Sequence, residues 1–163
     1  MPALSKKIVL QPAGPPDALA IAELSRDLIE TGLGWRWTPA RVSQQIHDPE
    51  TLVLTARSRG ILIGFNIMNF GLETAHLSLF AVHRAWQRRG IGRQMFEWTR
   101  TSAVTAGIAL IRLELRANNR DASAFYRALG FREAGWAPGY YSGRETALRM
   151  QLDLRREIQR SQT

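Results

Sequence analysis

The 163-residue sequence contains no cysteine. Disulfide bonds, thiolate nucleophiles and cysteine-containing zinc sites are therefore excluded. No apolar run approaches the roughly 18 residues of a membrane-spanning helix, and Met1–Pro12 has no apolar core of the kind found in export signals. The three histidines, His47, His76 and His83, show no metal-ligand spacing, so we expect no metal and interpret them as incidental. These absences favour a cytoplasmic protein with no membrane partner.

Acidic residues are fewer than basic ones: the sequence has 14 aspartates and glutamates and 22 lysines and arginines, which gives a net charge of +8. Such a balance favours acidic partners, such as a nucleotide-like cofactor, nucleic acid or a ribosomal neighbourhood. No basic run is interleaved with aromatic residues in the way a nucleic-acid groove requires, so nucleic acid is not the expected partner. The length and the 45% apolar content predict a single globular domain over residues 1–163 with a real core.

Apolar periodicity and the positions of proline and glycine predict the element order β-α-α-β-β-β-α-β-α-β-β, which implies an α/β sheet of mixed sense. We expect Asp17 and Thr38 to cap two helices and Pro138–Arg144 to form a loop. The basic segment 155–163 is expected to be frayed. The expected strands cover residues 7–11, 51–57, 61–70, 76–82, 109–116, a segment from 131, and 146–154; the expected helices cover 18–30, 39–47, 94–106 and a segment from 118 or 119.

A strand that runs into a basic, glycine-containing turn occupies Leu79–Arg93. Glycines without side chains let a bulky anion approach the backbone, and the first N–H groups of the following helix would point at it. The residues that suit a phosphate or pyrophosphate are three arginines and two glycines: Arg88, Arg89, Arg93, Gly90 and Gly92. A P-loop would need Gly-Lys-Ser/Thr and a dinucleotide-binding turn a third glycine, and both are missing. A basic, solvated helix start remains the alternative.

The pattern Gln-x-x-Gly-x-Gly after a strand, at Gln87–Gly92, resembles the GNAT acyltransferase superfamily. Longer blocks resemble its RimI-type branch, the N-terminal alanine acetyltransferases of a ribosomal protein; they are Phe80–Val82, Gln87–Arg93, Leu113–Asn119, Ala124–Phe131 and, in the tail, Gly139–Tyr141 and Ala147–Met150. The resemblance implies a GNAT fold, with a mixed, mostly antiparallel sheet of about seven strands and about four helices, splayed between its fourth and fifth strands. It also implies acetyl-CoA as the acyl donor.

Carried over residue by residue, the resemblance implies that the turn holds the pyrophosphate of the coenzyme through Arg88, Arg89, Gly90, Ile91, Gly92 and Arg93. The strand backbone of Phe80, Ala81 and Val82 would bind the pantetheine arm, and one of its N–H groups would stabilise the thioester oxygen. Asn119 would contact the coenzyme near its thiol. A buried strand is the alternative for residues 80–82, and the two interpretations are compatible because the backbone does the chemistry.

Glu114 matches the general base of the family, a carboxylate that takes a proton from the incoming ammonium through water. It lies in an apolar strand, on the face opposite to Leu113 and Leu115. The alternative is a half-solvated strand face on which Glu114 pairs with arginine. An N-terminal α-amine has a pKa near 8, so losing its proton at pH 7 costs only about 1–1.5 kcal/mol, against about 5 kcal/mol for lysine, and a modest base suffices.

Tyr126 matches the general acid of the family, which donates toward the departing thiolate. Transfer of a proton from a phenol to a thiolate is uphill by about 2 kcal/mol, so we expect Tyr126 to help by hydrogen bonding as charge develops. The alternative is an amphipathic core tyrosine beside Phe125. Because the chain has no cysteine, the simplest chemistry is direct attack of the amine on the thioester, without an acyl-enzyme.

Aromatic residues are expected to line the acceptor groove, with Trp35 and Trp37 on one wall and Tyr140 and Tyr141 on the other. The pair Trp37-Thr38 fits the aromatic-proline-tryptophan-serine element of the branch, but Arg36 replaces the proline. Leu79 stands where the branch usually has asparagine. Plain core or loop packing is the alternative interpretation of these aromatic residues.

The first hypothesis is an acetyl-CoA-dependent N-acetyltransferase that acts on a peptide or protein α-amine. A ribosomal protein is among the candidate partners, and the enzyme would be a monomer or a homodimer. The second hypothesis is a GNAT enzyme that acetylates a small-molecule amine, an antibiotic or a lysine side chain. The third is a basic RNA-binding or ribosome-binding module without catalysis. The acceptor amine and the length of the acyl chain stay open at this point.

Overall fold

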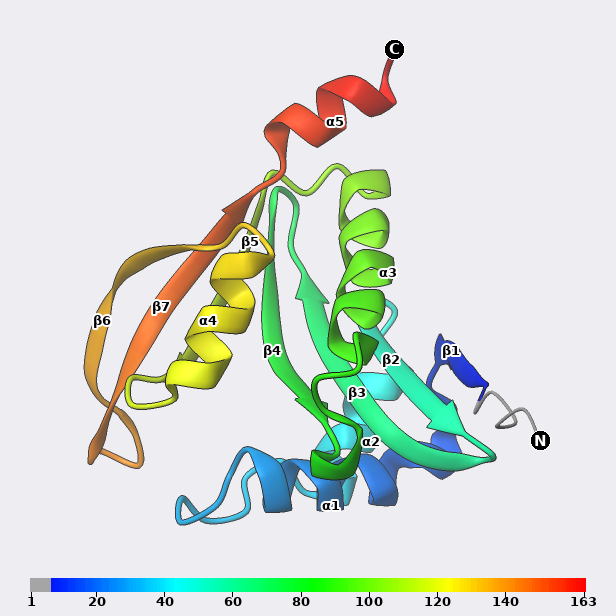
Figure 1. The fold of residues 1–163 in the computed structure, drawn as a ribbon, viewed down its shortest axis with the longest axis vertical. Helices are drawn as coiled ribbons and strands as arrows, with labels where there is room; N and C mark the ends of the chain where they lie inside the picture. Colours follow the sequence, from blue (N-terminus) through cyan, green and yellow to red (C-terminus); the bar gives the residue numbers. More distant parts are fainter. Residues whose placement is uncertain (1–6) are drawn as a thin grey trace. The chain divides into compact units, whose positions relative to one another are not determined.

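The computed structural model describes residues 7–163, which form a mixed α/β fold (Figure 1). Seven strands make one sheet in the order β1-β2-β3-β4-β5-β7-β6, with β4 and β5 parallel and the other neighbours antiparallel. The strands are β1 (Ile8–Pro12), β2 (Thr51–Ser58), β3 (Ile61–Phe70), β4 (Thr74–Val82), β5 (Leu110–Arg116), β6 (Arg132–Tyr141) and β7 (Glu145–Asp153). In the same residues the α-helices are α1 (Ala18–Leu28), α2 (Pro39–His47), α3 (Ile91–Thr105), α4 (Arg120–Ala128) and α5 (Arg155–Ser161). The predicted fold class is confirmed.

The chain divides into two compact units. The first consists of Met1–Met68 and Leu79–Thr99, and the second of Asn69–Ser78 and Arg100–Thr163. The strands β3 and β4 and the helix α3 pass from one unit into the other. The prediction of a single domain over the whole chain stays a prediction. The predicted absence of an export signal in Met1–Pro12 falls partly on residues 1–6, which lie outside the described residues.

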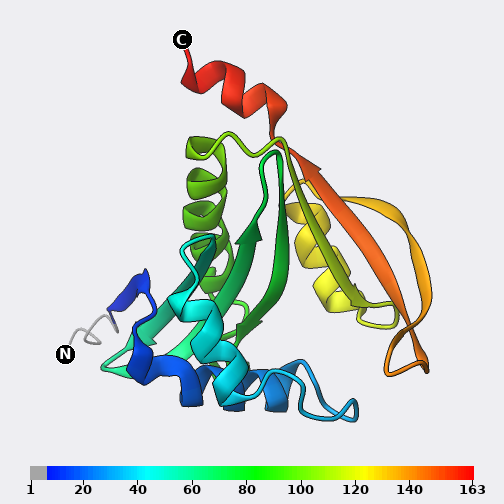
Figure 2. The same ribbon diagram turned by 180° about the vertical axis from the view of Figure 1, so that it is seen from behind.

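The strands of the first unit carry helices on both faces (Figure 2). One face packs against α1 and α2 through a core that includes Ile21 and Val42. The other face packs against the start of α3 through Ile91 and Met95. A strand that is covered on both sides buries both alternating sets of side chains. The continuous apolar sequence of β3 follows from this, because every residue from 63 to 68 is buried.

Two local signals form as the sequence predicts. The Thr38 hydroxyl accepts a hydrogen bond from the backbone N–H of Arg41 at 3.3 Å, and Pro39 is the first residue of α2. Arg59 and Gly60 join β2 to β3 with φ angles of 52° and 78°. Positive φ at both residues is the geometry of the tight turn whose twist matches an antiparallel hairpin.

Asp17 occupies the N-cap position of α1, as predicted, but its side chain makes no hydrogen bond to that helix. A short 3-10 helix, Pro15–Asp17, comes first, and the Asp17 carboxylate turns back to accept the Gly14 N–H at 2.8 Å. The same carboxylate forms an ion pair with Arg57 of β2. A charged partner and a preceding turn therefore compete successfully with the helix for this side chain.

The loop predicted for Pro138–Arg144 is shorter than expected. Pro138 lies inside β6, and the connection to β7 is reduced to residues 142–144. The strand β6 is at the edge of the sheet, and its register with β7 shifts between Ala137 and Tyr141. An edge strand with such an irregularity tolerates proline because the missing N–H leaves no ladder bond unmade.

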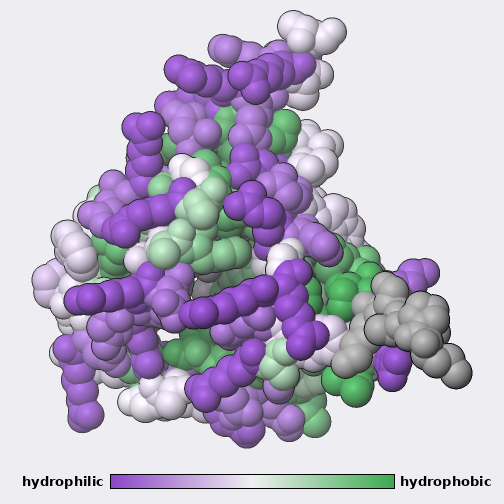
Figure 3. Space-filling model, viewed as in Figure 1, coloured by the Kyte–Doolittle hydropathy of each residue, from purple (hydrophilic) through white to green (hydrophobic). Residues whose placement is uncertain are grey.

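Most of the segment expected to be frayed, residues 155–161, is helical. Its helix, α5, is anchored at its start by Leu154, which is fully buried, and by Asp153, which accepts the Arg155 N–H at 2.9 Å. An ion pair of 2.7 Å between Arg100 and Glu157 holds it further along. Hydrophilic side chains cover α5 in the space-filling view (Figure 3), which explains why composition alone suggests a solvated tail.

The helix after the basic turn also differs from the prediction. It begins at Ile91, three residues before the expected start, so Ile91, Gly92 and Arg93 form its first turn. No helix within residues 7–163 is both long enough and apolar enough to cross a membrane.

Candidate active site

The basic turn of the first unit has the backbone geometry of an anion site. Arg88 and Gly90 both have positive φ, at 62° and 80°. The first helical hydrogen bond of α3 runs from Gln94 N to Gly90 O at 3.1 Å. The preceding N–H groups, of residues 91–93, have no acceptor within their own helix, and the positive end of the helix dipole lies there. Arg88 is not a glycine, so its left-handed conformation costs about 1–2 kcal/mol, a strain that is common at functional sites.

The surroundings of this turn fit a diphosphate. The guanidinium-bearing residues Arg88, Arg89 and Arg93 are all exposed. No acidic residue occurs between Val82 and Glu97. A Cβ built on Gly90 would meet no atom within 4 Å, so the backbone there is open to an approaching group. Open backbone donors with three neighbouring cations suit the pyrophosphate of coenzyme A.

Gln87, the first residue of the Gln-x-x-Gly-x-Gly pattern, has a structural task. Its Nε2 donates to the carbonyl of Val82 at 2.8 Å, which ties the turn to the end of β4. His83 donates its backbone N–H to Ile63 O at 2.7 Å, and its ring accepts the Ala85 N–H at 3.2 Å. These bonds fix the path of the chain from the strand into the turn.

The side chains of residues 79–82 are committed to the core. Leu79 and Ala81 pack on the face that α1 and α2 cover, and Phe80 and Val82 pack toward α3. The strand is therefore covered on both faces, with Leu79 and Ala81 buried and Phe80 and Val82 partly buried, which agrees with the alternative of a buried strand. The burial also explains Leu79 in a position where the branch usually has asparagine, because that side chain is only 6% exposed. Any contact of Phe80, Ala81 and Val82 with the coenzyme stays a prediction and falls to their backbone.

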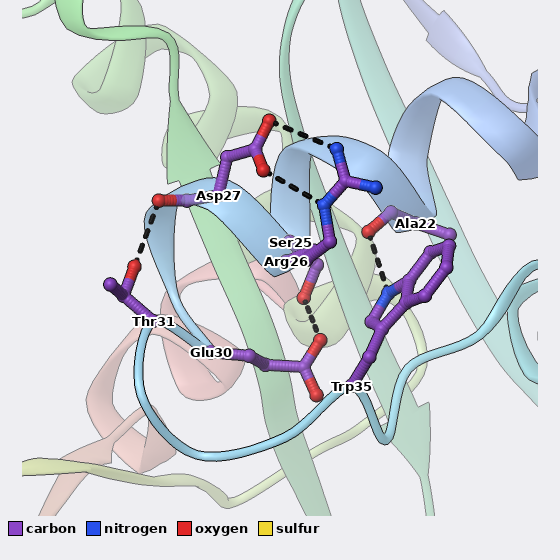
Figure 4. A network of polar contacts seen from close by, with 7 residues as sticks. All are labelled: Ala22, Ser25, Arg26, Asp27, Glu30, Thr31 and Trp35. Carbon is purple, nitrogen blue, oxygen red and sulfur yellow. Dashed lines mark hydrogen bonds and ion pairs between the residues drawn. The ribbon is translucent and has the colours of Figure 1, made fainter.

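A buried carboxylate, which sequence reasoning missed, shapes the segment that contains the two tryptophans. Glu30 is 8% exposed. Its Oε1 accepts the backbone N–H groups of Arg36 at 2.7 Å and Trp37 at 3.0 Å. Its Oε2 accepts the hydroxyl of Ser25 at 3.1 Å (Figure 4). One side chain at the end of α1 therefore determines the conformation of residues 36 and 37.

The two tryptophans have different environments. The indole N–H of Trp35 donates to the carbonyl of Ala22 at 3.1 Å (Figure 4), and the Arg26 guanidinium lies 5.1 Å from its ring. Trp37 packs against the core between α1, α2 and the sheet, with Arg41 stacked on it at 3.8 Å. Trp35 is the more exposed of the two, so it is the better candidate for contact with an acceptor. The packing alternative fits Trp37.

Replacing Glu30 by Ala is expected to destabilise the protein by about 2–4 kcal/mol, because two backbone N–H groups and one hydroxyl lose a buried acceptor. Glu30→Gln is the matched control, since its amide oxygen still accepts both N–H groups, and it should cost about 1 kcal/mol. Urea denaturation measures the free energy of unfolding of each variant. Equal stability of the two variants would show that the carboxylate does not organise this segment.

Glu114, in β5 of the second unit, is shielded rather than half-solvated. Its side chain is 16% exposed. His76 Nε2, from β4, meets its Oε2 in a hydrogen-bonded ion pair. Arg149, directly opposite in β7, places Nε 3.7 Å from Oε1. The pairing with arginine that the alternative interpretation expects is thus present, while the pairing with His76 was missed, because His76 had been interpreted as incidental.

The surroundings of Glu114 keep it ionised. The hydrogen bond from His76 is the main cause that lowers the pKa of this carboxyl, and the charges of His76 and Arg149 add to it, although burial opposes the shift. An open hollow of about 350 Å³ borders the carboxylate, and Arg112, Arg149 and Gln151 also line it. A carboxylate that stays charged beside open space can receive a proton from a bound ammonium.

Tyr126 is held on α4 between two aromatic rings. The ring centroids of Phe125 and Phe131 lie 5.3 and 5.4 Å from its own, both in edge-to-face geometry. Burial, with a smaller contribution from the nearby phenol of Tyr141, raises the pKa of Tyr126 well above its ordinary value. The neutral phenol is therefore the stable form, and its O–H can donate a hydrogen bond. The amphipathic core position and a donor role are both compatible with this geometry.

Two more predicted residues gather near Glu114. Tyr140 and Tyr141 stack edge to face, with ring centroids 4.9 Å apart. Burial raises the pKa of both phenols, and the negative charge of Glu114 raises it further. Asn119, expected at the thiol, is the N-cap of α4, and its Oδ1 accepts the Ala122 N–H at 3.1 Å. Contact between Asn119 and the coenzyme, which stays a prediction, would have to use the amide nitrogen.

Comparison with known proteins assigns the chain to one class of enzyme. Residues 21–154 match the model of the acetyltransferase (GNAT) domain. The chain belongs to this family, and it is an N-acetyltransferase that uses acetyl-CoA as its donor. The predicted family, enzyme class and donor are confirmed.

The chain is also similar to individual N-terminal acetyltransferases within this family. The [ribosomal protein bS18]-alanine N-acetyltransferase of Salmonella typhimurium is 39% identical over 106 residues, which are 63% of this chain and 70% of that protein. The N-alpha-acetyltransferase RimI of Mycobacterium tuberculosis is 32% identical over 109 residues, 64% of this chain and 67% of that protein. The crystal structure of the ribosomal-protein-S18-alanine N-acetyltransferase from Escherichia coli matches with a TM-score of 0.79 at 27% identity, covering 90% of this chain and 94% of that one.

Proposed function

We propose that this enzyme, in the cytoplasm, acetylates the α-amine at the N terminus of a peptide or protein. The observation that carries the proposal is Glu114, a shielded carboxylate that His76 and Arg149 keep ionised at the edge of an open hollow. The relatives from Salmonella typhimurium and Mycobacterium tuberculosis, whose names describe N-terminal acetylation, support the choice of acceptor. A ribosomal protein N terminus is the first acceptor to test.

Each group of residues has one task in the reaction. Acetyl-CoA, when bound, supplies the thioester carbonyl that the amine attacks. Arg88, Arg89 and Arg93, with the N–H groups of the first turn of α3, bind the pyrophosphate. Glu114 takes a proton from the acceptor nitrogen, which leaves a lone pair on that nitrogen for attack. Tyr126 donates a hydrogen bond to the sulfur as the carbon–sulfur bond breaks and negative charge develops there.

The low pKa of Glu114 favours an α-amine over a lysine side chain. A carboxylate that gives up its proton easily is a weak base. An α-ammonium, with a pKa near 8, loses its proton more readily than a lysine, with a pKa near 10.4, by about 3 kcal/mol. A weak base therefore suits an α-ammonium, which loses its proton more readily than a lysine ammonium.

A small-molecule amine is the second candidate, and one observation favours it. Arg112 and Arg149 line the hollow beside Glu114, and both are exposed. Two guanidinium groups could bind the carboxylate of an acceptor whose amine faces Glu114. Amines that carry a carboxylate group are the small acceptors to include.

Mass spectrometry of acceptors incubated with enzyme and acetyl-CoA tests the proposal. Three sets are needed: peptides with a free N terminus and no lysine, the same peptides blocked at the N terminus with one lysine added, and small amines with or without a carboxylate. We expect a gain of one acetyl group on the first set alone. Acetylation of the blocked peptides or of the small amines, with the first set untouched, would contradict it.

Replacing Tyr126 by Phe is expected to lower kcat about tenfold and to leave the Kd of acetyl-CoA unchanged, because the phenol acts only on the charge that develops during reaction. The raised pKa keeps Tyr126 protonated, so this residue should cause no loss of activity between pH 8 and 10 in the wild type. Steady-state kinetics and titration calorimetry measure the two constants. A rise in Kd together with an unchanged kcat would assign Tyr126 to packing alone.

A further inference from the structure

The sequence alone suggests no role for His76, but this residue lies at the centre of a series of hydrogen-bonded side chains. It lies on β4, where Thr74, Ala75 and His76 pair in parallel with residues 110–112 of β5. Glu114 follows Arg112 by two positions and therefore lies on the same face of β5. The imidazole uses both nitrogens: Nε2 meets Glu114 Oε2, and Nδ1 lies 3.0 Å from Ser78 Oγ.

The hydrogen-bonded series continues beyond Nδ1 of the imidazole. The Ser78 hydroxyl donates to Asn69 Oδ1 at 2.5 Å. The Ser78 oxygen lies 3.0 Å from His76 Nδ1 and fixes the orientation of the ring. On the other side, a bare nitrogen against a carboxylate oxygen would bring two lone pairs together, so Nε2 donates to Glu114 Oε2.

We propose that His76 is a positioning residue for Glu114: it binds Oε2 and leaves Oε1 for the acceptor. This inference rests on the proposed role of Glu114. A hydrogen bond to one carboxylate oxygen restricts rotation of the side chain and so orients the other oxygen.

Other charged and titratable groups face the same carboxylate. Arg149 of β7 and Arg112 of β5 line the hollow with Glu114, and the phenols of Tyr140 and Tyr141 on β6 respond to its charge. Arg149 Nε comes only within 3.7 Å of Glu114 Oε1, beyond hydrogen-bond distance, so the hydrogen bond that fixes the carboxylate comes from His76.

Kinetics of two His76 variants give the first test. H76L removes the donor and should lower kcat/KM at least tenfold at pH 8. H76Q keeps an uncharged N–H donor and should restore most of that rate, since glutamine Nε2 can replace the imidazole nitrogen. A rate of H76Q no higher than that of H76L would overturn the proposal.

Nitrogen-15 NMR of the side chains gives a second test that needs no acceptor. The chain has only three histidines, so the His76 signals are those that disappear in H76Q. We expect the signals of His76 Nε2 and its hydrogen to move in E114Q, because the hydrogen bond then goes to a neutral amide oxygen instead of a carboxylate. Unmoved signals would overturn the proposal even if the enzyme is active. Moved signals in a fully active E114Q would instead refute Glu114 as the base and leave the pairing intact, so the two failures are distinguishable.

Discussion

Glu114→Gln is expected to lower kcat/KM about 100-fold at pH 7, with a smaller loss above pH 8. Positioned general bases contribute roughly 10²–10⁴-fold, and an α-amine with a pKa near 8 supplies part of its own deprotonated form at alkaline pH. Glutamine preserves the shape and the acceptor for His76 but removes the negative charge. Because the pKa of Glu114 is already lowered, the wild-type enzyme should not lose activity through protonation of this residue at any pH above about 5.

The control for this variant is Glu133→Gln in β6. Glu133 is also a carboxylate paired with an arginine, Arg127, in the same unit, but its side chain is 45% exposed. We expect its kcat/KM to stay within about twofold of the wild type, since exposed ion pairs contribute little. Rates are measured from pH 6 to 9.5 with an acceptor identified by mass spectrometry. Wild-type rates of Glu114→Gln at pH 7 would remove Glu114 from the mechanism.

Replacing Arg88, Arg89 and Arg93 together by Gln is expected to raise the KM for acetyl-CoA about 100-fold and to leave kcat nearly unchanged. All three side chains are exposed, so each contact to the pyrophosphate is assigned about 1 kcal/mol, well below the value for a buried charged hydrogen bond. Three such contacts give about 3 kcal/mol, which is roughly a factor of 100. The KM of the wild type should also rise with salt more steeply than that of the variant.

Two controls separate this effect from a general change in charge. Arg155→Gln removes an exposed arginine of α5 and should leave the KM for acetyl-CoA unchanged. Acetyl-pantetheine lacks the pyrophosphate, so the wild type and the triple variant should use it equally well. A triple variant with the wild-type KM, or one that loses acetyl-pantetheine as severely as acetyl-CoA, would refute the assignment of the pyrophosphate to this turn.

The elements that the sequence predicted correctly depend on local signals. Thr38 and Pro39 begin α2, Arg59 and Gly60 form a hairpin turn, and Gly107 ends α3 with a φ of 77°. In each case, the physical reason lies within a few residues of the signal itself: a hydroxyl that reaches the next turn, or a backbone angle that glycine adopts without strain. The glycines and arginines of the basic turn are also local signals, which can be recognised from the sequence alone.

The predictions of local structure failed where contacts with residues distant in the sequence determine the conformation. Asp17 occupies the N-cap position of α1, but its carboxylate binds Gly14 N–H and pairs with Arg57, forty positions away, instead of bonding to the helix. The tail at 155–161 is helical because Glu157 pairs with Arg100 and Leu154 is buried. Neither partner can be inferred from spacing along the chain.

The sequence by itself determined the family, the order of the elements and the motif residues, because these depend on local chemistry and on side chains carried at fixed spacing. The tertiary structure decided the electrostatic state of the site. It placed His76 and Arg149 against Glu114, from strands that precede and follow it by more than thirty positions. It also brought the Glu30 carboxylate to the backbone N–H groups of Arg36 and Trp37. The pKa of a carboxyl depends on the charges and donors within a few ångströms of it, and only the pairing of strands specifies which residues those are.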